Sequence, residues 1–192
     1  MLEQLKAWDQ EFLLFLNQFH TDALDPVAYY VTKTEFWIPL YVFLLFLIFR
    51  DQKKAGWFVV AGLALSVLLT DQITSSLMKP YFQRLRPSHE PGLEGLLHLV
   101  YNYRGGLYGF ASSHAANTAG VATFIFLLLR PAYRFTWTIF LWAAVMSYTR
   151  IYLGVHYPGD ILVGGLVGFA CGYLAFRFHL LLKARFRPQA KA

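Results

Sequence analysis

Three short polar stretches stand between the apolar runs of this 192-residue chain, and each holds residue types suited to binding an anion. They are KPYFQRLRP at 79–87, ASSH at 111–114 and TRIYLGVHYPGD at 149–160. Lys and Arg bind phosphate oxygens, histidine can act as a nucleophile or carry a proton, and a carboxylate can orient it. Together the stretches indicate a phosphate-directed site, provided that the fold brings them together.

The third stretch has the arrangement most typical of covalent catalysis. Pro158 suits the first position of a helix, so Asp160 falls in the first helical turn and His156 in the loop before it. A carboxylate there can accept the imidazole N–H and leave the other ring nitrogen free to attack. Arg150 adds a cation six residues earlier. The alternative is a helix-capping aspartate beside an interfacial histidine.

The second stretch predicts the start of a helix. Ser112 or Ser113 is expected to cap it, because serine before an apolar run is a helix-start signal. The free backbone N–H groups of a helix N-terminus bind anions, and His114 would lie in the first turn facing such an anion. The alternative is a capped helix with a surface histidine.

The first stretch places two cations, Lys79 and Arg86, seven residues apart and each before a proline. A residue before proline favours an extended backbone, so we expect a stiff strap here rather than a continuing helix. An Arg fork and a Lys point charge suit a phosphate. The alternative is a pair of interfacial anchors whose side chains snorkel to the membrane surface.

The elements that must position these stretches are membrane helices. Hydrophobic residues make up 57% of the chain and charged residues 15%, against about 25% charged in a soluble domain. Five apolar runs can each cross a bilayer, the first with Asp25 as its N-cap and Pro26 as its first residue. The sequence predicts one all-α domain, a polytopic membrane helix bundle over 25–182, with spans near 26–49, 55–78, 113–129, 133–149 and 158–182.

The two ends of the chain suggest how the bundle sits in the membrane. Residues 1–24 alternate acidic and apolar positions at helical spacing, which predicts an amphipathic interfacial helix or, alternatively, an ordinary packing helix. Ten of the seventeen Lys and Arg residues fall on the side of the basic tail at 183–192. By the positive-inside rule the C-terminus is cytoplasmic and the polar stretches face outward. The net charge of +6 is therefore assigned to topology and not to nucleic-acid binding.

Two further features concern packing and the support of the site. Gly164, Gly168 and Gly172 recur every four residues, which predicts close approach of another helix. Asp71, at the polar end of the second run, is expected to partner one of the motif cations. No cluster of acidic residues accompanies the motifs, so neither a metal nor another cofactor is expected.

The three stretches resemble the motifs of the type 2 phosphatidic acid phosphatase superfamily, which includes bacterial acid phosphatases and vanadium haloperoxidases. Residues 79–87 match its K-x6-RP motif, and 149–160 match SR-x5-H-x3-D with Thr149 in place of Ser. In the PSGH motif, Ala111 replaces Pro and Ser113 replaces Gly, which leaves the backbone of that turn in question. The order of motifs and spans is similar to that of the membrane-bound lipid phosphatases of this family.

The resemblance implies a role for each motif residue. His156 would attack phosphorus and form a phosphohistidine, Asp160 would orient it, and His114 would protonate the leaving oxygen. The phosphoryl oxygens would be held by Lys79, Arg86, Arg150, Ser112 and Ser113.

The resemblance implies an integral lipid phosphatase of the inner membrane, with a lipid phosphate as substrate and membrane lipids as partners. Undecaprenyl pyrophosphate is the preferred substrate, ahead of phosphatidylglycerophosphate, phosphatidic acid and lipid A phosphate. A lipid phosphotransferase using the same histidine and a non-catalytic phospholipid-binding or transport protein remain alternatives. The oligomeric state is left open.

Overall fold

The computed structural model describes residues 1–185, and every regular element within them is helical. The predicted all-α class is therefore confirmed. Across these residues extended backbone pairs once, in an isolated antiparallel bridge between Leu85 and Tyr108. Residues 186–192, most of the predicted tail, lie outside the described part. The α-helices are α1 Leu2–Asn17, α2 Leu24–Val31, α3 Ile38–Gln52, α4 Gly56–Asp71, α5 Lys79–Phe82, α6 Ser113–Leu129, α7 Ile139–Tyr152 and α8 Pro158–Arg185.

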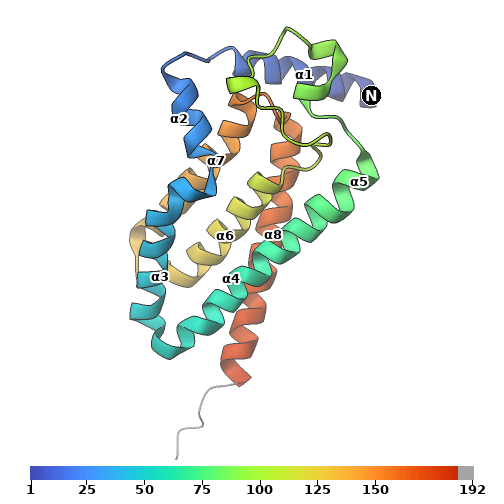
Figure 1. The fold of residues 1–192 in the computed structure, drawn as a ribbon. Helices are drawn as coiled ribbons and strands as arrows, with labels where there is room; N and C mark the ends of the chain where they lie inside the picture. The colour runs from blue at the N-terminus through green and yellow to red at the C-terminus, as the bar shows by residue number, and fades with distance from the viewer. Residues whose placement is uncertain (186–192) are drawn as a thin grey trace, which may run out of the picture.

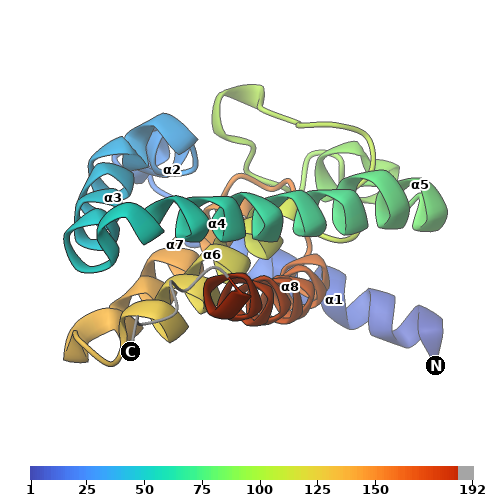
Figure 2. The same cartoon turned by 90° about the horizontal axis from the view of Figure 1, so that it is seen from below.

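Helix α6 lies at the centre of the bundle, with α4, α7 and α8 packed around it (Figure 1, Figure 2). The N-termini of α6 and α8 and the end of α5 point toward the end of the bundle that α1 crosses, and α8 ends beyond the opposite end. All three polar stretches therefore reach one end of the bundle.

The small residues of α8 serve close packing, as predicted. A Cβ atom on Gly164, Gly168 or Gly172 would collide with a backbone carbonyl oxygen of the α6 segment, at Ser112, Ala116 and Gly120 respectively. Because α6 and α8 approach this closely, the first turns of both helices lie side by side. Their packing fixes ASSH against the segment that carries His156 and Asp160.

Among the described residues, two helical runs are long and apolar enough to cross a membrane, Thr34–Phe82 and Pro158–Arg185, and Ser113–Leu129 is a shorter apolar helix. The first run doubles back at the short 3-10 turn Lys53–Ala55, so that α3 and α4 form two legs (Figure 1). The count of five transmembrane helices stays a prediction.

The first predicted span is wrong as a single helix that begins at Pro26. Helix α2 starts at Leu24 with Ala23 as its N-cap, and the chain turns extended at Lys33 before α3 begins. Asp25 does not cap the helix because its carboxylate is used elsewhere, accepting hydrogen bonds from the Tyr152 hydroxyl and His98 Nε2, both at 2.8 Å. Tertiary contacts thus override the local helix-start signal.

The predicted strap is also wrong at its beginning. Lys79 is helical although it precedes Pro80. The helix continues to Phe82 and ends at Gln83, which has the left-handed conformation. A π-helical segment, Gln72–Met78, comes directly before it. Such segments are rare and often lie at functional sites. Of the two residues that precede a proline in the predicted strap, Arg86 alone has the expected extended backbone, with φ −68° and ψ 154°.

Helix α1 lies across the end of the bundle that the three polar stretches reach, and it presents two different faces (Figure 1). Leu13 and Asn17 are buried, whereas Trp8, Phe12 and Phe15 are more than half exposed. Asn17 Nδ2 donates to backbone carbonyls at the end of α7, which fixes the inner face of α1 to the bundle. The exposed aromatic face is compatible with an interfacial position of α1, which stays a prediction.

Candidate active site

His156 and Asp160 form a buried pair at the start of α8. The imidazole Nδ1 lies 3.2 Å from Asp160 Oδ2, which also accepts the Tyr157 backbone N–H at 3.1 Å. His156 is 1% exposed and Asp160 is fully buried. No described residue forms a hydrogen bond with His156 Nε2. The carboxylate thus fixes the ring through one nitrogen and leaves the other free to react.

Arg84 completes this pair, and the sequence analysis assigned it no role. Its guanidinium donates to Asp160 Oδ1 at 3.0 Å and to Asp9 Oδ2 of α1 at 2.8 Å. It also stacks on Tyr157, 3.8 Å from the ring centroid. Asp9 Oδ1 in turn accepts the Gly159 backbone N–H at 2.7 Å. Helix α1 therefore holds the histidine–carboxylate pair from outside, through a residue inside the first motif.

Two arginines bring unused donors to the same place. Arg150 donates through Nη1 to the Thr32 hydroxyl at 2.9 Å, and Arg86 donates through Nε to the Tyr108 carbonyl at 3.2 Å. Arg86 Nη1 and Arg150 Nε are buried and have no hydrogen-bond partner among the described residues. A buried N–H without a partner is costly, by about 1–3 kcal/mol, so these groups are suited to a ligand oxyanion.

The electrostatics of His156 show how closely the cations surround it. Burial is the largest cause that holds the pKa of His156 well below its ordinary value, and the charges of Arg86, Arg150, Lys79 and Arg84 lower it further. Burial, followed by the charge of Arg150, likewise lowers the pKa of Arg86. The imidazole is therefore neutral and able to act as a nucleophile, within a field that attracts an anion.

Lys79 joins the site through Ser113, the residue that departs from the family motif. Its Nζ lies 2.7 Å from Ser113 Oγ, which is also within 2.9 Å of the hydroxyls of Thr74 and Ser75. Ser113 is the first residue of α6 and has no positive φ, so the position does not need glycine. Asp71 accepts from the Ser75 hydroxyl at 2.9 Å, and Ser75 links it to Lys79.

Ser112 is the N-cap of α6, which confirms one of the two predicted caps. Its Oγ accepts the Ala115 backbone N–H at 3.4 Å, and its own N–H donates to the Asp160 carbonyl at 3.0 Å. His114 follows in the first helical turn, where no described residue bonds its ring. The α6 N-terminus therefore opens next to the start of α8, with a histidine from each of the two segments.

The loop 83–112 packs tightly against the cations. A Cβ on Gly105, whose φ is +67°, would lie 2.8 Å from Arg86 Nη1. A Cβ on Gly109 would lie 3.0 Å from Asp160 Oδ2. Backbone without side chains at these two points lets the loop cover the site while the guanidinium stays in place.

The described residues contain no group of three or more His, Cys, Asp or Glu side chains that could hold a metal ion. The positive charge near His156 comes instead from arginine and lysine side chains. Several contributors lay outside the sequence interpretation: Arg84, Asp9, Thr32, Thr74, Ser75 and Tyr108. Only Arg84 could have been found, since it is a cation inside the first motif.

A helical bundle with apolar spans and a buried histidine–aspartate pair among cations defines a membrane protein built for phosphoryl chemistry. Comparison with known proteins gives the family. Residues 55–183 match the PAP2 superfamily, and the chain belongs to that superfamily. It is a lipid phosphatase of the PAP2 type.

The relatives cover nearly the whole chain. The Lipid A 4'-phosphatase of Porphyromonas gingivalis is 36% identical over 96% of this chain and 78% of its own length. That of Bacteroides thetaiotaomicron is 38% identical over 96% and 83%. An undecaprenyl-diphosphatase of Sulfolobus acidocaldarius is 28% identical over 90% and 79%. The crystal structure of Aquifex aeolicus LpxE superposes with a TM-score of 0.67 at 27% identity, covering 88% of this chain and 94% of that one.

Proposed function

We propose that the protein removes a phosphate from lipid A by way of a phosphohistidine on His156. The observation that carries the chemistry is the pair of buried, unpartnered guanidinium nitrogens of Arg86 and Arg150 near His156. The choice of lipid A rests on the two relatives of that activity, which match more of this chain at higher identity than the undecaprenyl-diphosphatase does. By the same similarity we propose the 4'-phosphate as the group removed.

In the first step His156 Nε2 attacks phosphorus, forming an N–P bond while the P–O bond to the lipid breaks. Asp160 accepts the Nδ1–H and stabilises the positive charge that develops on the ring. His114 donates a proton to the leaving lipid oxygen. Arg86, Arg150 and Lys79, with the N-terminal N–H groups of α6, hold the equatorial phosphoryl oxygens, where charge stabilisation matters most.

In the second step a water molecule attacks the phosphohistidine. His114, now neutral, takes a proton from that water, the N–P bond breaks, and inorganic phosphate leaves. The reaction returns both histidines to their starting protonation states. Ser112 and Ser113 add the helix cap and a hydroxyl beside Lys79. No step requires a metal ion, and we propose that the enzyme is metal-independent.

Undecaprenyl pyrophosphate, preferred in the sequence analysis, becomes the second candidate, supported by the Sulfolobus acidocaldarius relative at lower identity. A phosphotransferase would use the same intermediate with an alcohol in place of water. A non-catalytic lipid-binding protein would keep the cations without needing the His156–Asp160 pair. That pair favours catalysis over binding.

We also propose an orientation in the inner membrane. The site lies at the end of the bundle that α1 crosses, and α8 ends at the opposite end (Figure 1). Most Lys and Arg residues belong to that opposite end, so the positive-inside rule supports a periplasm-facing site and a cytoplasmic C-terminus. The exposed aromatic side chains of α1 would then rest at the outer interface.

The test uses the purified protein in detergent with EDTA present. Lipid A bisphosphate, undecaprenyl pyrophosphate and phosphatidic acid are supplied separately, and phosphate release is measured together with the mass of each lipid product. We expect loss of one phosphate from lipid A at the 4' position, and no release by a His156→Ala variant. Release restricted to another lipid would refute the proposed substrate. Equal release by both proteins would remove His156 as the nucleophile, and a phosphorylated alcohol without free phosphate would indicate the transferase.

A further inference from the structure

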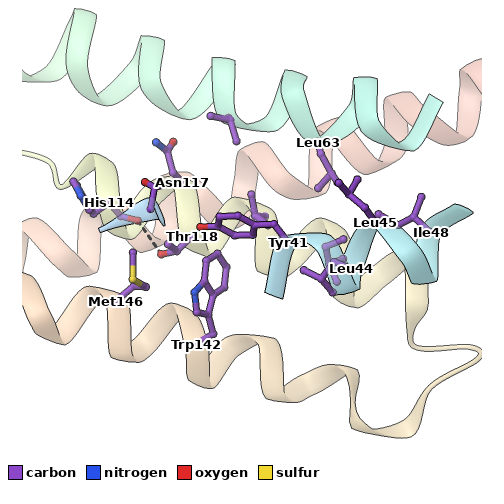
Figure 3. Close-up of a pocket in the computed structure, with 14 residues that line it drawn as sticks. Tyr41, Leu44, Leu45, Ile48, Leu63, His114, Asn117, Thr118, Trp142 and Met146 are labelled. Carbon is purple, nitrogen blue, oxygen red and sulfur yellow. Dashed lines mark hydrogen bonds between the residues drawn. The ribbon is translucent and has the colours of Figure 1, made fainter. Parts of the chain in front are cut away.

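A pocket of about 450 Å³ extends from the phosphate site into the apolar part of the bundle (Figure 3). It lies between α3, α4, α6 and α7, and His114 lines its outer end. Its inner end is aliphatic, with Leu44, Leu63 and Ile48. Because one of its walls is a residue of the phosphate site, a lipid bound by its phosphate can extend a chain into this pocket.

The outer end of the pocket carries two polar groups that the fold leaves available. Asn117 lies three residues after His114, about 4.5 Å further along the helix. Its Oδ1 lies within hydrogen-bonding reach of the Thr70 hydroxyl, and no described residue bonds its Nδ2. Tyr41 points across the pocket from α3, and no described residue bonds its hydroxyl either (Figure 3).

The neighbouring polar group of the pocket is already satisfied. The Thr118 hydroxyl donates to the His114 carbonyl at 2.8 Å within its own helix, the bond drawn in Figure 3. The Asn117 and Tyr41 side chains are only partly buried, and neither the amide N–H nor the phenolic O–H has a partner among the described residues. Hydrocarbon that fills the pocket would remove water from both groups, which is unfavourable for each group that stays unpaired. A ligand that brings one acceptor oxygen and otherwise hydrocarbon would restore those bonds.

We propose that this pocket binds a fatty acyl chain of the substrate and that Asn117 and Tyr41 donate to the carbonyl oxygen at the head of that chain. The inference rests on the proposed function, because it specifies which feature of the lipid accompanies the phosphate. A carbonyl has two lone pairs, so it can accept from both groups at once. The aliphatic inner end then takes the hydrocarbon.

The same arrangement separates acylated lipid phosphates from polyprenyl ones. An isoprenoid chain has no oxygen beyond its diphosphate, so it would displace water from the pocket and leave the two donors unpaired. A site built to donate hydrogen bonds discriminates strongly against an analogue that lacks the acceptor. Asn117 and Tyr41 are therefore specificity-determining residues for an acyl ester next to the phosphate.

The experiment compares two synthetic substrates that differ in one carbonyl. Glucosamine 4-phosphate carrying a 3-O-acyl chain is compared with the 3-O-alkyl ether of equal chain length, and undecaprenyl pyrophosphate is the third substrate. The wild-type protein, Asn117→Leu and Tyr41→Phe are assayed for kcat/KM on each. Thr123→Val and Tyr173→Phe are the matched controls, since they lose a hydroxyl from α6 and from α8 outside the pocket.

We expect the wild type to prefer the ester to the ether by ~10–100-fold, because loss of the carbonyl removes two hydrogen bonds of ~3–10-fold each. Asn117→Leu and Tyr41→Phe should lower kcat/KM on the ester by ~3–10-fold and leave the ether unchanged. Tyr41→Phe keeps the ring, so it tests the proposal even if Asn117→Leu fails to fold. Equal wild-type rates on ester and ether, or an ester preference kept in Tyr41→Phe and in folded Asn117→Leu, would overturn the carbonyl site alone. Turnover of undecaprenyl pyrophosphate with none of either sugar phosphate would overturn the proposed function as well.

Discussion

Replacing Asp160 by Asn tests the central pair with a change of very few atoms. Asp160 Oδ2 accepts from His156 Nδ1 at 3.2 Å and from the Tyr157 N–H at 3.1 Å, and Oδ1 accepts from Arg84 at 3.0 Å. All three partners are donors. An amide has one acceptor oxygen and one NH2 group, so whichever way it turns, a donor must face a donor.

The size of the effect follows from the contacts that are lost. If the NH2 faces His156, the ring loses its acceptor and its preferred tautomer; if it faces Arg84, the ion pair is lost and the remaining bond to His156 is no longer charge-assisted. Hydrogen bonds to charged groups contribute about 1.5–3 kcal/mol each. Two such losses, about 3–6 kcal/mol, correspond to a decrease in kcat of ~10²–10⁴-fold.

The assay is phosphate release under saturating lipid, with phosphohistidine trapped by rapid quenching in a single turnover. We expect the decrease to appear in formation of the phosphoenzyme. Asp51→Asn is the matched control, because Asp51 accepts from the Tyr133 hydroxyl at 2.7 Å near the other end of the bundle. A folded Asp160→Asn protein with kcat within ~3-fold of wild type would refute the orienting role.

Three further outcomes follow from burial and charge. Because its pKa is depressed, His156 stays neutral in the folded protein but takes up a proton in the unfolded protein below the ordinary pKa of 6.5. The contribution of His156 to stability should therefore fall as the pH drops below that value, by up to about 1.4 kcal/mol per pH unit. The Tm of wild type minus that of His156→Gln should decrease from pH ~7.5 to ~5, and a constant difference would contradict a buried neutral ring. Asp25→Asn removes the charge that His98 Nε2 approaches at 2.8 Å; we expect a loss of about 1–3 kcal/mol, seen as a Tm lower by ~2–10 °C, with no change in the exposed control Asp22→Asn. Vanadate at ~100-fold its Kd should raise Tm by ~5–10 °C by binding the unpartnered guanidinium groups, and an unchanged Tm would mean that they do not form an oxyanion site.

The sequence was sufficient to predict which residues would gather, because each lies at a helix end whose position the apolar runs determine. Apolar runs beginning at 113 and 158 imply that Ser112 and His156 lie at one level of the bundle. The glycine repeat of α8 implies that another helix approaches it closely, and the structure identifies that helix as α6. These local signals are all compatible with one arrangement of the helices. The spacing of the motifs and the positions of the apolar runs therefore indicate the same site.

The contacts that were not predicted from the sequence join residues far apart in the chain, so no local sequence pattern indicates them. Asp9 meets Arg84 across 75 residues, and that meeting depends on how α1 crosses the bundle. Lys79 stays helical before a proline, directly after the π segment Gln72–Met78. The helix is interrupted at Lys33, one residue after Thr32, whose hydroxyl accepts a hydrogen bond from Arg150. Asp9 and Thr32 thus make tertiary contacts that outweigh a local preference of about 1 kcal/mol.

Arg84 also explains why the site remains positive although it contains a buried carboxylate. Asp160 lies among cations and could neutralise Arg86 or Arg150, which would remove the attraction for phosphate. Arg84 pairs with its Oδ1, so the carboxylate is neutralised by a cation other than Arg86 and Arg150, and Asp9 holds Arg84 in place. Within residues 1–185, Lys79, Arg86 and Arg150 form no ion pair with an acidic side chain. Their mutual repulsion disfavours the empty site, and it is relieved as negative charge builds on the phosphoryl oxygens in the transition state. The Asp9–Arg84–Asp160 interaction thus leaves the Asp160 carboxylate available to His156 and the remaining cations available to the substrate.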